Sequence, residues 1–187
     1  LWRYMKAVPE RGKIVIFNRS HYEDVLVVKV HPELLGSAQL PDILHPNRLG
    51  KKFWQARYDD INNFEHHLVR NGTLILKFFL NVSRREQKKR FLERLENPDK
   101  HWKFSMADLA ERAFWKQYMS AYEEAMTATS TKWAPWHIIP ADHKWVTRAL
   151  VSGVISHAIN KLDLQYPVVT PEKLAALAKA KRDLMRE

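Results

Sequence analysis

Residues 18–24 concentrate groups that could bind and activate a charged substrate. Asn18 through Asp24 supply one amide, one guanidinium, one imidazole and two carboxylates. They follow five mostly apolar residues, 13–17, that are typical of a buried strand. Because ligands of open α/β sheets bind beyond the carboxyl ends of the strands, this position favours a binding site. An ordinary strand that ends in a solvated turn is the alternative.

A second segment, residues 84–96, carries many cationic side chains on one predicted helix. Its lysines and arginines are Arg84, Arg85, Lys88, Lys89, Arg90 and Arg94. Like charges one helical turn apart, such as Arg84 and Lys88, repel each other, and a bound anion would relieve that repulsion. The alternative is a solvated basic face that the glutamates of the same segment partly neutralise.

These two segments together indicate phosphoryl transfer. Such reactions need guanidinium and ammonium groups, usually with Mg²⁺, to stabilise charge that develops on phosphate oxygens. A basic helix flanked by loops can also act as a lid that closes over phosphates and excludes water.

The composition limits the class of protein. A chain of 187 residues, 45% hydrophobic and 28% charged, predicts one globular domain. The net charge of +10 attracts polyanions, although solubility alone would also explain it. The absence of cysteine from the sequence excludes disulfides and thiolate metal sites and fits a cytoplasmic location. No apolar run approaches the roughly 18 residues that a membrane span needs.

The apolar patterns predict elements that would hold these residues in place. Strands are predicted at 13–18, 73–80 and 136–140. Helices are predicted at 53–70, 84–96, 106–128, 142–162 and from 171 onward, with Ser83, Ser105, Asp142 and Thr170 as their amino-terminal caps. Residues 25–30 could form a strand by composition, but we favour a helix or an irregular segment there. A strand, a long helix and then an apolar strand predict a parallel crossover and an α/β fold.

Several separated blocks of this sequence resemble one known family. Residues 16–28, Ile-Phe-Asn-Arg-Ser-His-Tyr-Glu-Asp-Val-Leu-Val-Val, closely resemble the second nucleotide-kinase motif of the type-2 polyphosphate kinases. Residues 76–80 and 85–91 are similar to the next strand and the lid helix of that family. The blocks at 97–104 and 134–141 continue the match in the same order.

The resemblance implies a P-loop kinase fold, a parallel sheet flanked by helices with a helical lid at about 83–105. All 187 residues would form a single domain, the carboxy-terminal part of that fold. It further implies Mg²⁺-dependent, reversible transfer of a terminal phosphoryl group between inorganic polyphosphate and a nucleoside mono- or diphosphate such as AMP, ADP or GDP.

The family also implies roles for individual residues. The implied catalytic residues are Asn18, Arg19, Arg90 and Arg94, and Asn18 would also lie at the metal. The implied phosphate-binding residues are Arg19, Arg84, Lys88, Arg90, Arg94, Lys100 and Lys103. The implied nucleotide-binding residues are His21, Tyr22, Glu23 and Asp24.

Two features depart from the family pattern. Many members carry Asp where this chain has Asn18, and an amide cannot balance the charge of Mg²⁺ as a carboxylate can. The sequence also contains no Gly-x-Asp-x-x-Gly-Lys loop, which in the family lies upstream of the position of Leu1. We therefore expect residues upstream of Leu1, and we expect this chain to be inactive alone.

The resemblance implies inorganic polyphosphate and a nucleotide as partners, and we expect a homo-oligomer, either a dimer or a tetramer, without membrane association. Nucleic acid is a less favoured partner. The alternatives to an enzyme are a non-catalytic protein that binds polyanions and a domain that binds nucleic acid.

Overall fold

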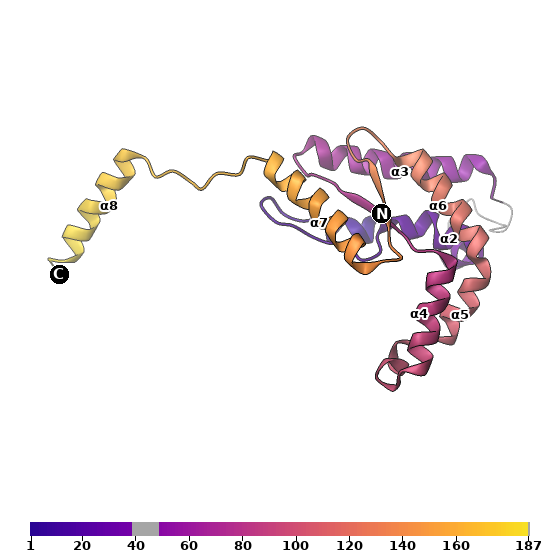
Figure 1. Ribbon diagram of the computed structural model, residues 1–187. Coiled ribbons are helices and arrows are strands. Elements are labelled where there is room, and N and C mark those ends of the chain that lie inside the picture. Colours follow the sequence, from indigo (N-terminus) through magenta and orange to yellow (C-terminus); the bar gives the residue numbers. More distant parts are fainter. Residues whose placement is uncertain (39–48, 187) are drawn as a thin grey trace. The chain divides into compact units, whose positions relative to one another are not determined.

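The computed structural model describes residues 1–38 and 49–186. Contacts within the chain divide it into two compact units, Leu1–Val151 and Ser152–Glu187. All the site residues that the sequence predicts lie in the first unit, which is shown with the rest of the chain in Figure 1.

The chain combines short 3₁₀-helices (η), α-helices and a small sheet. The elements are α1 (Trp2–Met5), η1 (His21–Val25), α2 (Val27–Val30), η2 (Pro32–Ala38), α3 (Lys51–Arg70), β1 (Lys77–Asn81), α4 (Arg84–Glu96), η4 (Pro98–Lys103), α5 (Met106–Glu111), η5 (Arg112–Phe114), α6 (Trp115–Thr129), β2 (Trp136–Pro140), α7 (Lys144–Lys161) and α8 (Pro171–Leu184).

The two strands confirm the α/β class. β1 and β2 pair in parallel, with Lys77 opposite Trp136 and Asn81 opposite Pro140. The chain between them runs through α4, η4, α5, η5 and α6, because parallel strands need a crossover connection.

The predicted strand at 13–18 is wrong for the described part of the chain, where these residues pair with no strand. Ile14 and Ile16 are 78% and 85% exposed. An apolar, β-branched run has the composition of a strand, but a strand also needs a neighbour that accepts its hydrogen bonds. The segment instead leads into η1 and α2, so the helical reading of residues 25–30 is confirmed.

Two other boundaries differ from the prediction. The second strand begins at Lys77 rather than at residue 73. The helix predicted at 106–128 is divided into α5 and α6 by η5, at the point where the lid joins the rest of the unit.

The core of the first unit lies where η1, α3 and α6 meet. Its buried residues are Tyr22, Val25, Leu26, Trp54, Tyr58, Ile61, Ala121 and Ala125. The buried positions of α3 recur every three or four residues, which places them on one face of the helix. α3 ends where predicted, because Gly72 adopts a positive φ of 90° that residues with a side chain rarely adopt.

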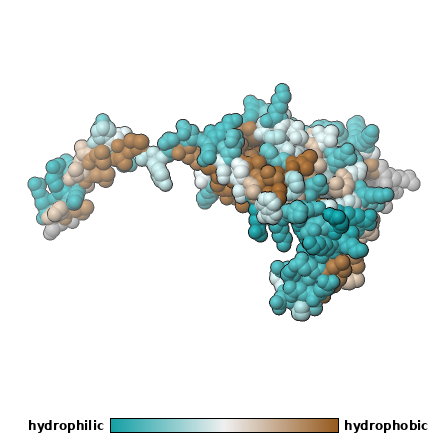
Figure 2. Space-filling view, in the orientation of Figure 1, coloured by the Kyte–Doolittle hydropathy of each residue, from teal (hydrophilic) through white to brown (hydrophobic). Residues whose placement is uncertain are grey.

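The helices α4 and η4 occupy the segment that we predict to be the lid, about 83–105, and in Figure 1 they extend away from β1 and α6 together with α5; we call these three helices the lid segment, or lid. Its surface is mostly hydrophilic (Figure 2). The Ser83 hydroxyl accepts a hydrogen bond from the Glu86 N–H at 3.1 Å, as the capping pattern predicts. We expected Asp142 to cap the helix that follows it. Its Oδ1 instead accepts a hydrogen bond from the Ser83 N–H at 2.7 Å and so binds the residue that caps α4.

In the second unit, α8 begins at the predicted cap. The Thr170 hydroxyl accepts a hydrogen bond from the Lys173 N–H at 3.3 Å, and Pro171 occupies the first turn. Among the described residues, no helix combines the length and the apolar character that crossing a membrane requires.

Candidate functional site

The loop that leads into η1 presents Asn18 and Arg19 to solvent. Arg19 has a φ of +66°, and its side chain is 81% exposed. Its Nε lies 3.5 Å from Glu23 Oε1, one turn further along the chain. The Ser20 hydroxyl accepts a hydrogen bond from the Tyr22 N–H at 3.4 Å and so begins η1.

Two tyrosines of α6 lie within the electrostatic reach of Arg19. Burial raises the pKa of Tyr122, the Glu23 carboxylate raises it further, and the Arg19 guanidinium opposes that shift. Burial also raises the pKa of Tyr118, where Arg19 again opposes the shift. Tyr122 in turn packs on Phe79 of β1, with ring centroids 4.7 Å apart. Arg19 and Glu23 therefore lie near α6, whose Tyr122 packs on the middle of β1.

This same region borders the base of the lid. The Tyr118 hydroxyl donates to Glu111 Oε2 at 2.7 Å, and Glu111 is the last residue of α5. His31 Nε2 lies 2.9 Å from the same carboxylate oxygen. The Arg112 guanidinium donates to Gln87 Oε1 at 2.5 Å and joins η5 to α4.

Tyr22 faces the interior rather than the solvent. It is 4% exposed, and its hydroxyl donates to Glu65 Oε1 at 2.8 Å. Lys77 Nζ donates to the Tyr22 hydroxyl at 2.9 Å and to Glu65 Oε2 at 2.6 Å. In this position the Tyr22 hydroxyl is occupied by buried partners and supports the loop from below.

His21 and Asp24 also turn towards α3. His21 Nε2 lies 3.4 Å from Glu65 Oε1, although the contact lacks hydrogen-bond geometry and the described residues offer this atom no other partner. His21 and Asp24 line a cavity of about 20 Å³ together with Arg57 and Asp60. A cavity of that size has room for about one water molecule and not for a nucleotide.

The lid cations differ in how firmly they are held. Arg90 donates three hydrogen bonds. Its Nε donates to Glu86 Oε1 at 2.9 Å, and its Nη2 donates to the carbonyl oxygens of Ala141 and Asp142 at 2.8 and 3.1 Å. Arg94 Nη1 lies 4.0 Å from Asp108 Oδ2.

The other predicted lid cations are more accessible. Lys100 Nζ pairs with Glu93 Oε1, and Lys103 Nζ lies 4.7 Å from the centre of the exposed Trp102 ring. Arg84 and Lys88 are exposed to solvent. These two side chains are therefore freer than Arg90 to meet an incoming anion.

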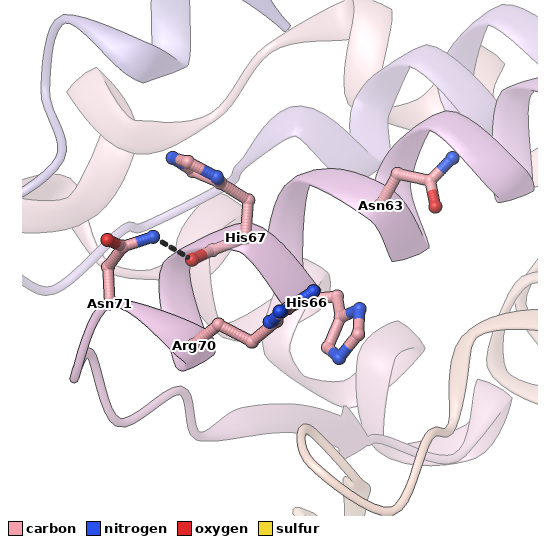
Figure 3. Close-up of a pocket in the computed structure, with 5 residues that line it drawn as sticks. All are labelled: Asn63, His66, His67, Arg70 and Asn71. Carbon is pink, nitrogen blue, oxygen red and sulfur yellow. Dashed lines mark hydrogen bonds between the residues drawn. The ribbon is translucent and has the colours of Figure 1, made fainter.

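A pocket in the described part of the chain lies elsewhere, at the end of α3. It has a volume of about 380 Å³ and is lined by Asn63, His66, His67, Arg70 and Asn71 (Figure 3). None of the site residues that the sequence predicts is among them.

Known proteins resemble the part of the chain that contains the loop and the parallel strands described above. The family described as Polyphosphate kinase 2 (PPK2) matches residues 1–167. This chain belongs to the polyphosphate kinase 2 family.

Relatives within the polyphosphate kinase 2 family match most of this chain. An ADP-polyphosphate phosphotransferase of Rhodopseudomonas palustris is 47% identical over 186 residues, 100% of this chain and 63% of that protein. An AMP/ADP-polyphosphate phosphotransferase of Meiothermus ruber is 47% identical over 167 residues, 89% of this chain and 57% of that protein.

A solved structure supports the same fold. The crystal structure of Polyphosphate Kinase 2 from Arthrobacter aurescens matches with a TM-score of 0.81 and 41% identity, over 95% of this chain and 59% of that one. The chain thus spans about three fifths of the length of these relatives.

Mg²⁺ is the metal that the family resemblance implies. Within residues 1–38 and 49–186, no group of three or more acidic or histidine side chains could hold a metal ion. Mg²⁺ in phosphoryl-transfer sites keeps several waters and takes one or two protein oxygens together with substrate phosphates. The exposed Asn18 amide and the half-buried Glu23 carboxylate suit that limited role, but they form no cage by themselves.

Sequence reasoning missed Glu65 and Lys77, the two charged residues beneath the loop. Both left a signal in the sequence. Glu65 interrupts the apolar stripe of α3 between Ile61 and Leu68, and Lys77 interrupts the apolar run 73–80. A charge on the buried face of an element needs a partner, and such a pair of interruptions predicts a buried ion pair.

Proposed function

We propose that the protein transfers a terminal phosphoryl group, reversibly and with Mg²⁺, between inorganic polyphosphate and AMP or ADP, with GDP as a further possible acceptor. The observation that carries this proposal is the solvent-exposed Arg19 in the family motif, whose charge reaches Tyr118, a residue bonded to Glu111 at the end of α5. The names of the relatives, ADP-polyphosphate and AMP/ADP-polyphosphate phosphotransferase, support the choice of substrates.

In this proposal, the chain's own groups bind and stabilise phosphate oxygens. Arg19 would grip a phosphate near the transferred group, because a planar guanidinium can donate two parallel hydrogen bonds. Arg84, Lys88, Arg94, Lys100 and Lys103 would contact the polyphosphate from the lid. Mg²⁺, bound with the phosphates, would neutralise part of their charge.

Arg90 would act differently from the other lid cations. Since its guanidinium already bridges Glu86 to the carbonyl oxygens after β2, we assign it to holding the lid in place. His21, Tyr22 and Asp24 would shape the nucleotide side from beneath the loop, and Glu23 would orient Arg19.

We also propose a cytoplasmic homo-oligomer. The lack of cysteine fits a reducing compartment. Exposed large apolar side chains, among them Trp145 at 74% and Trp102 at 78%, would favour association between copies.

The test is an assay of the full-length gene product with polyphosphate, Mg²⁺ and either AMP or ADP. We expect the next higher nucleotide to form, measured by chromatography, and we expect none without polyphosphate or with excess chelator. Absence of the higher nucleotide in the complete reaction would exclude the proposed activity.

A polyanion-binding protein without chemistry is the second candidate, because Arg84, Arg85, Lys88 and Lys89 are all exposed on one helix. Binding of nucleic acid would weaken steeply with salt and would not need Mg²⁺. Competition between short polyphosphate and an oligonucleotide, followed by fluorescence anisotropy, separates the two partners.

A further inference from the structure

The buried charges beneath the loop form a complete hydrogen-bond network. Glu65 is 1% exposed and Lys77 is 6% exposed. An ammonium group has three N–H donors, and Lys77 uses them on Glu65 Oε2, the Tyr22 hydroxyl and the Thr129 carbonyl oxygen, at 2.6, 2.9 and 2.8 Å. The Tyr22 hydroxyl donates onward to the other oxygen of Glu65.

This network joins parts of the chain that are far apart in sequence. Tyr22 belongs to η1, Glu65 to α3, Lys77 to β1 and Thr129 to α6. The Trp136 indole N–H of β2 donates to the Thr129 hydroxyl at 3.0 Å and adds a fifth element. The network therefore fixes η1 against both strands and two long helices at once.

Stability alone does not explain these buried charges. Replacing a buried ion pair by apolar side chains of similar volume is often neutral or stabilising, because desolvation offsets the attraction between the charges. Burial lowers the pKa of Lys77, a shift that Glu65 opposes, and burial raises the pKa of Tyr22 far above its ordinary value. Tyr22 thus stays a neutral donor, and each hydrogen bond of the network keeps its direction.

The network binds the loop through the Tyr22 hydroxyl, and Glu65 also faces His21 Nε2 at 3.4 Å. Further along, Val25 and Leu26 hold the end of η1 through apolar burial, at 0% and 7% exposure. The start of η1 is held by the Tyr22 hydrogen bonds, by the Ser20 cap, which Arg19 directly precedes, and by the His21 ring, which packs on Phe64. Losing the contacts of Tyr22 and Glu65 would therefore loosen residues 18–21 and leave the core in place.

We propose that Glu65 and Lys77 are positioning residues that act through Tyr22 to hold Arg19 in place. The inference rests on the proposed function in one respect, namely that Arg19 grips a phosphate. A displacement of about 1 Å at a clamp of this kind is enough to lower turnover by about 10²-fold.

The test uses the full-length gene product and two kinds of variant. Glu65→Leu with Lys77→Met replaces the ion pair by apolar side chains, and Tyr22→Phe removes only the hydroxyl. Lys29→Met is the matched control, because it removes an ion pair with Glu124 in the same unit without contact to the network. Should the double variant fail to fold, Tyr22→Phe carries the test alone.

The expected results concern stability, turnover and amide exchange. The double variant unfolds at the temperature of the unsubstituted protein or at a higher one. Its kcat falls by about 10²-fold, with a much smaller change in KM. This loss of kcat is not additive with the loss of kcat in Arg19→Ala. The amides of residues 18–22 exchange hydrogen faster in both network variants, whereas Lys29→Met changes neither kcat nor their exchange.

The outcomes separate the two proposals. Unchanged amide exchange at 18–22 overturns the inference even if the protein proves inactive, because that readout needs no turnover. Full additivity with Arg19→Ala overturns it as well. Inactivity of the unsubstituted protein, with faster exchange in the variants, contradicts only the proposed function.

Discussion

Arg19 adopts a backbone conformation that side-chain-bearing residues rarely use. In the described ranges, it shares a positive φ only with Asp163 among residues other than glycine. The left-handed conformation costs an L-residue roughly 1–2 kcal/mol, and such strain gathers at functional sites, where the surrounding structure enforces it. The conformation and the exposure of Arg19 together single it out as the residue to test first.

Replacing Arg19 separates its chemistry from its backbone strain. Arg19→Ala should lower kcat by about 10²–10³-fold, because a clamp acts mainly on charge in the transition state. Arg19→Gly should lose the same activity. Its free energy of unfolding should lie within about 1 kcal/mol of that of the unsubstituted protein, or exceed it, because glycine accepts a positive φ. Steady-state kinetics and chemical denaturation measure the two effects.

Arg11→Ala provides the control for charge alone, because Arg11 is also an exposed arginine near the start of the chain. It should leave kcat unchanged. If Arg11→Ala and Arg19→Ala had equal effects on turnover, Arg19 would be acting through net charge and not as a clamp.

His31 links the segment after α2 to the base of the lid. Its Nε2 lies 2.9 Å from Glu111 and its Nδ1 lies 3.1 Å from Glu33. The hydrogen bond to Glu111 raises the pKa of His31, burial opposes the shift, and the charges of Glu111 and Glu33 add to it. Hydrogen bonds from Tyr118 and His31 lower the pKa of Glu111.

This pair predicts a pH dependence of stability. A raised pKa means that protonated His31 stabilises the folded state at pH below its ordinary value of 6.5, and that this contribution disappears as the pH rises through the raised pKa. Glu111, whose pKa is lowered, contributes above its ordinary value of 4.5 and loses its contribution as the pH falls through the lowered one. The unfolding free energy should therefore fall as the pH rises above 6.5 and through the raised pKa of His31.

His31→Gln should flatten that part of the profile, as measured by urea denaturation across pH. Glutamine can still donate a hydrogen bond to Glu111 but does not titrate. If the unfolding free energy of His31→Gln fell by the same amount over this pH range, a group other than His31 would cause the pH dependence.

At the scale of the elements, the lid contains two kinds of cation that respond differently to substitution. Arg90→Ala should lower the unfolding free energy by about 1–3 kcal/mol, because it leaves the carbonyl oxygens of Ala141 and Asp142 without their donor. Lys88→Ala should leave stability unchanged within about 0.5 kcal/mol and raise the KM for polyphosphate, because its side chain is exposed.

Thermal unfolding and steady-state kinetics at two salt concentrations distinguish these effects. The effect of Lys88→Ala on KM should shrink at high salt, where charges in solvent are screened. Substitution of the exposed Leu92 by Ala on the same helix is a control for helix packing. A stability loss in Lys88→Ala equal to that in Arg90→Ala would contradict the division.

The sequence predicted helices better than strands, for a physical reason. α3 carries its own amphipathic pattern and the glycine stop signal, and α4 and α8 carry their own side-chain caps, all of which are local in sequence. Whether residues 13–18 form a strand depends on a neighbour elsewhere in the chain, and local composition cannot report it. The break at η5 was also missed, because the aromatic spacing of 106–128 continues through it.

At the scale of the whole molecule, the loop and the lid segment could be predicted, but the buried network beneath the loop could not. Asn18 and Arg19 are adjacent in sequence, and the lid cations lie within one segment, residues 84–103. Glu65 and Lys77 meet Tyr22 only after the chain folds, from positions 43 and 55 residues away, and Thr129 joins them through its bond to Lys77. The burial of Tyr22 itself was hidden for the same reason.

The unpaired segment 13–17 has a consequence for handling the protein. Its Ile14, Val15, Ile16 and Phe17 side chains are 78%, 44%, 85% and 41% exposed, and their free main-chain groups can act as a template for intermolecular β-pairing. We expect the 187-residue polypeptide, expressed by itself, to aggregate with thioflavin-positive β-structure. Ile16→Lys should raise its soluble yield, whereas Ile159→Lys should not. The short segment that precedes Arg19 would thus also determine how long the purified polypeptide stays in solution before it aggregates.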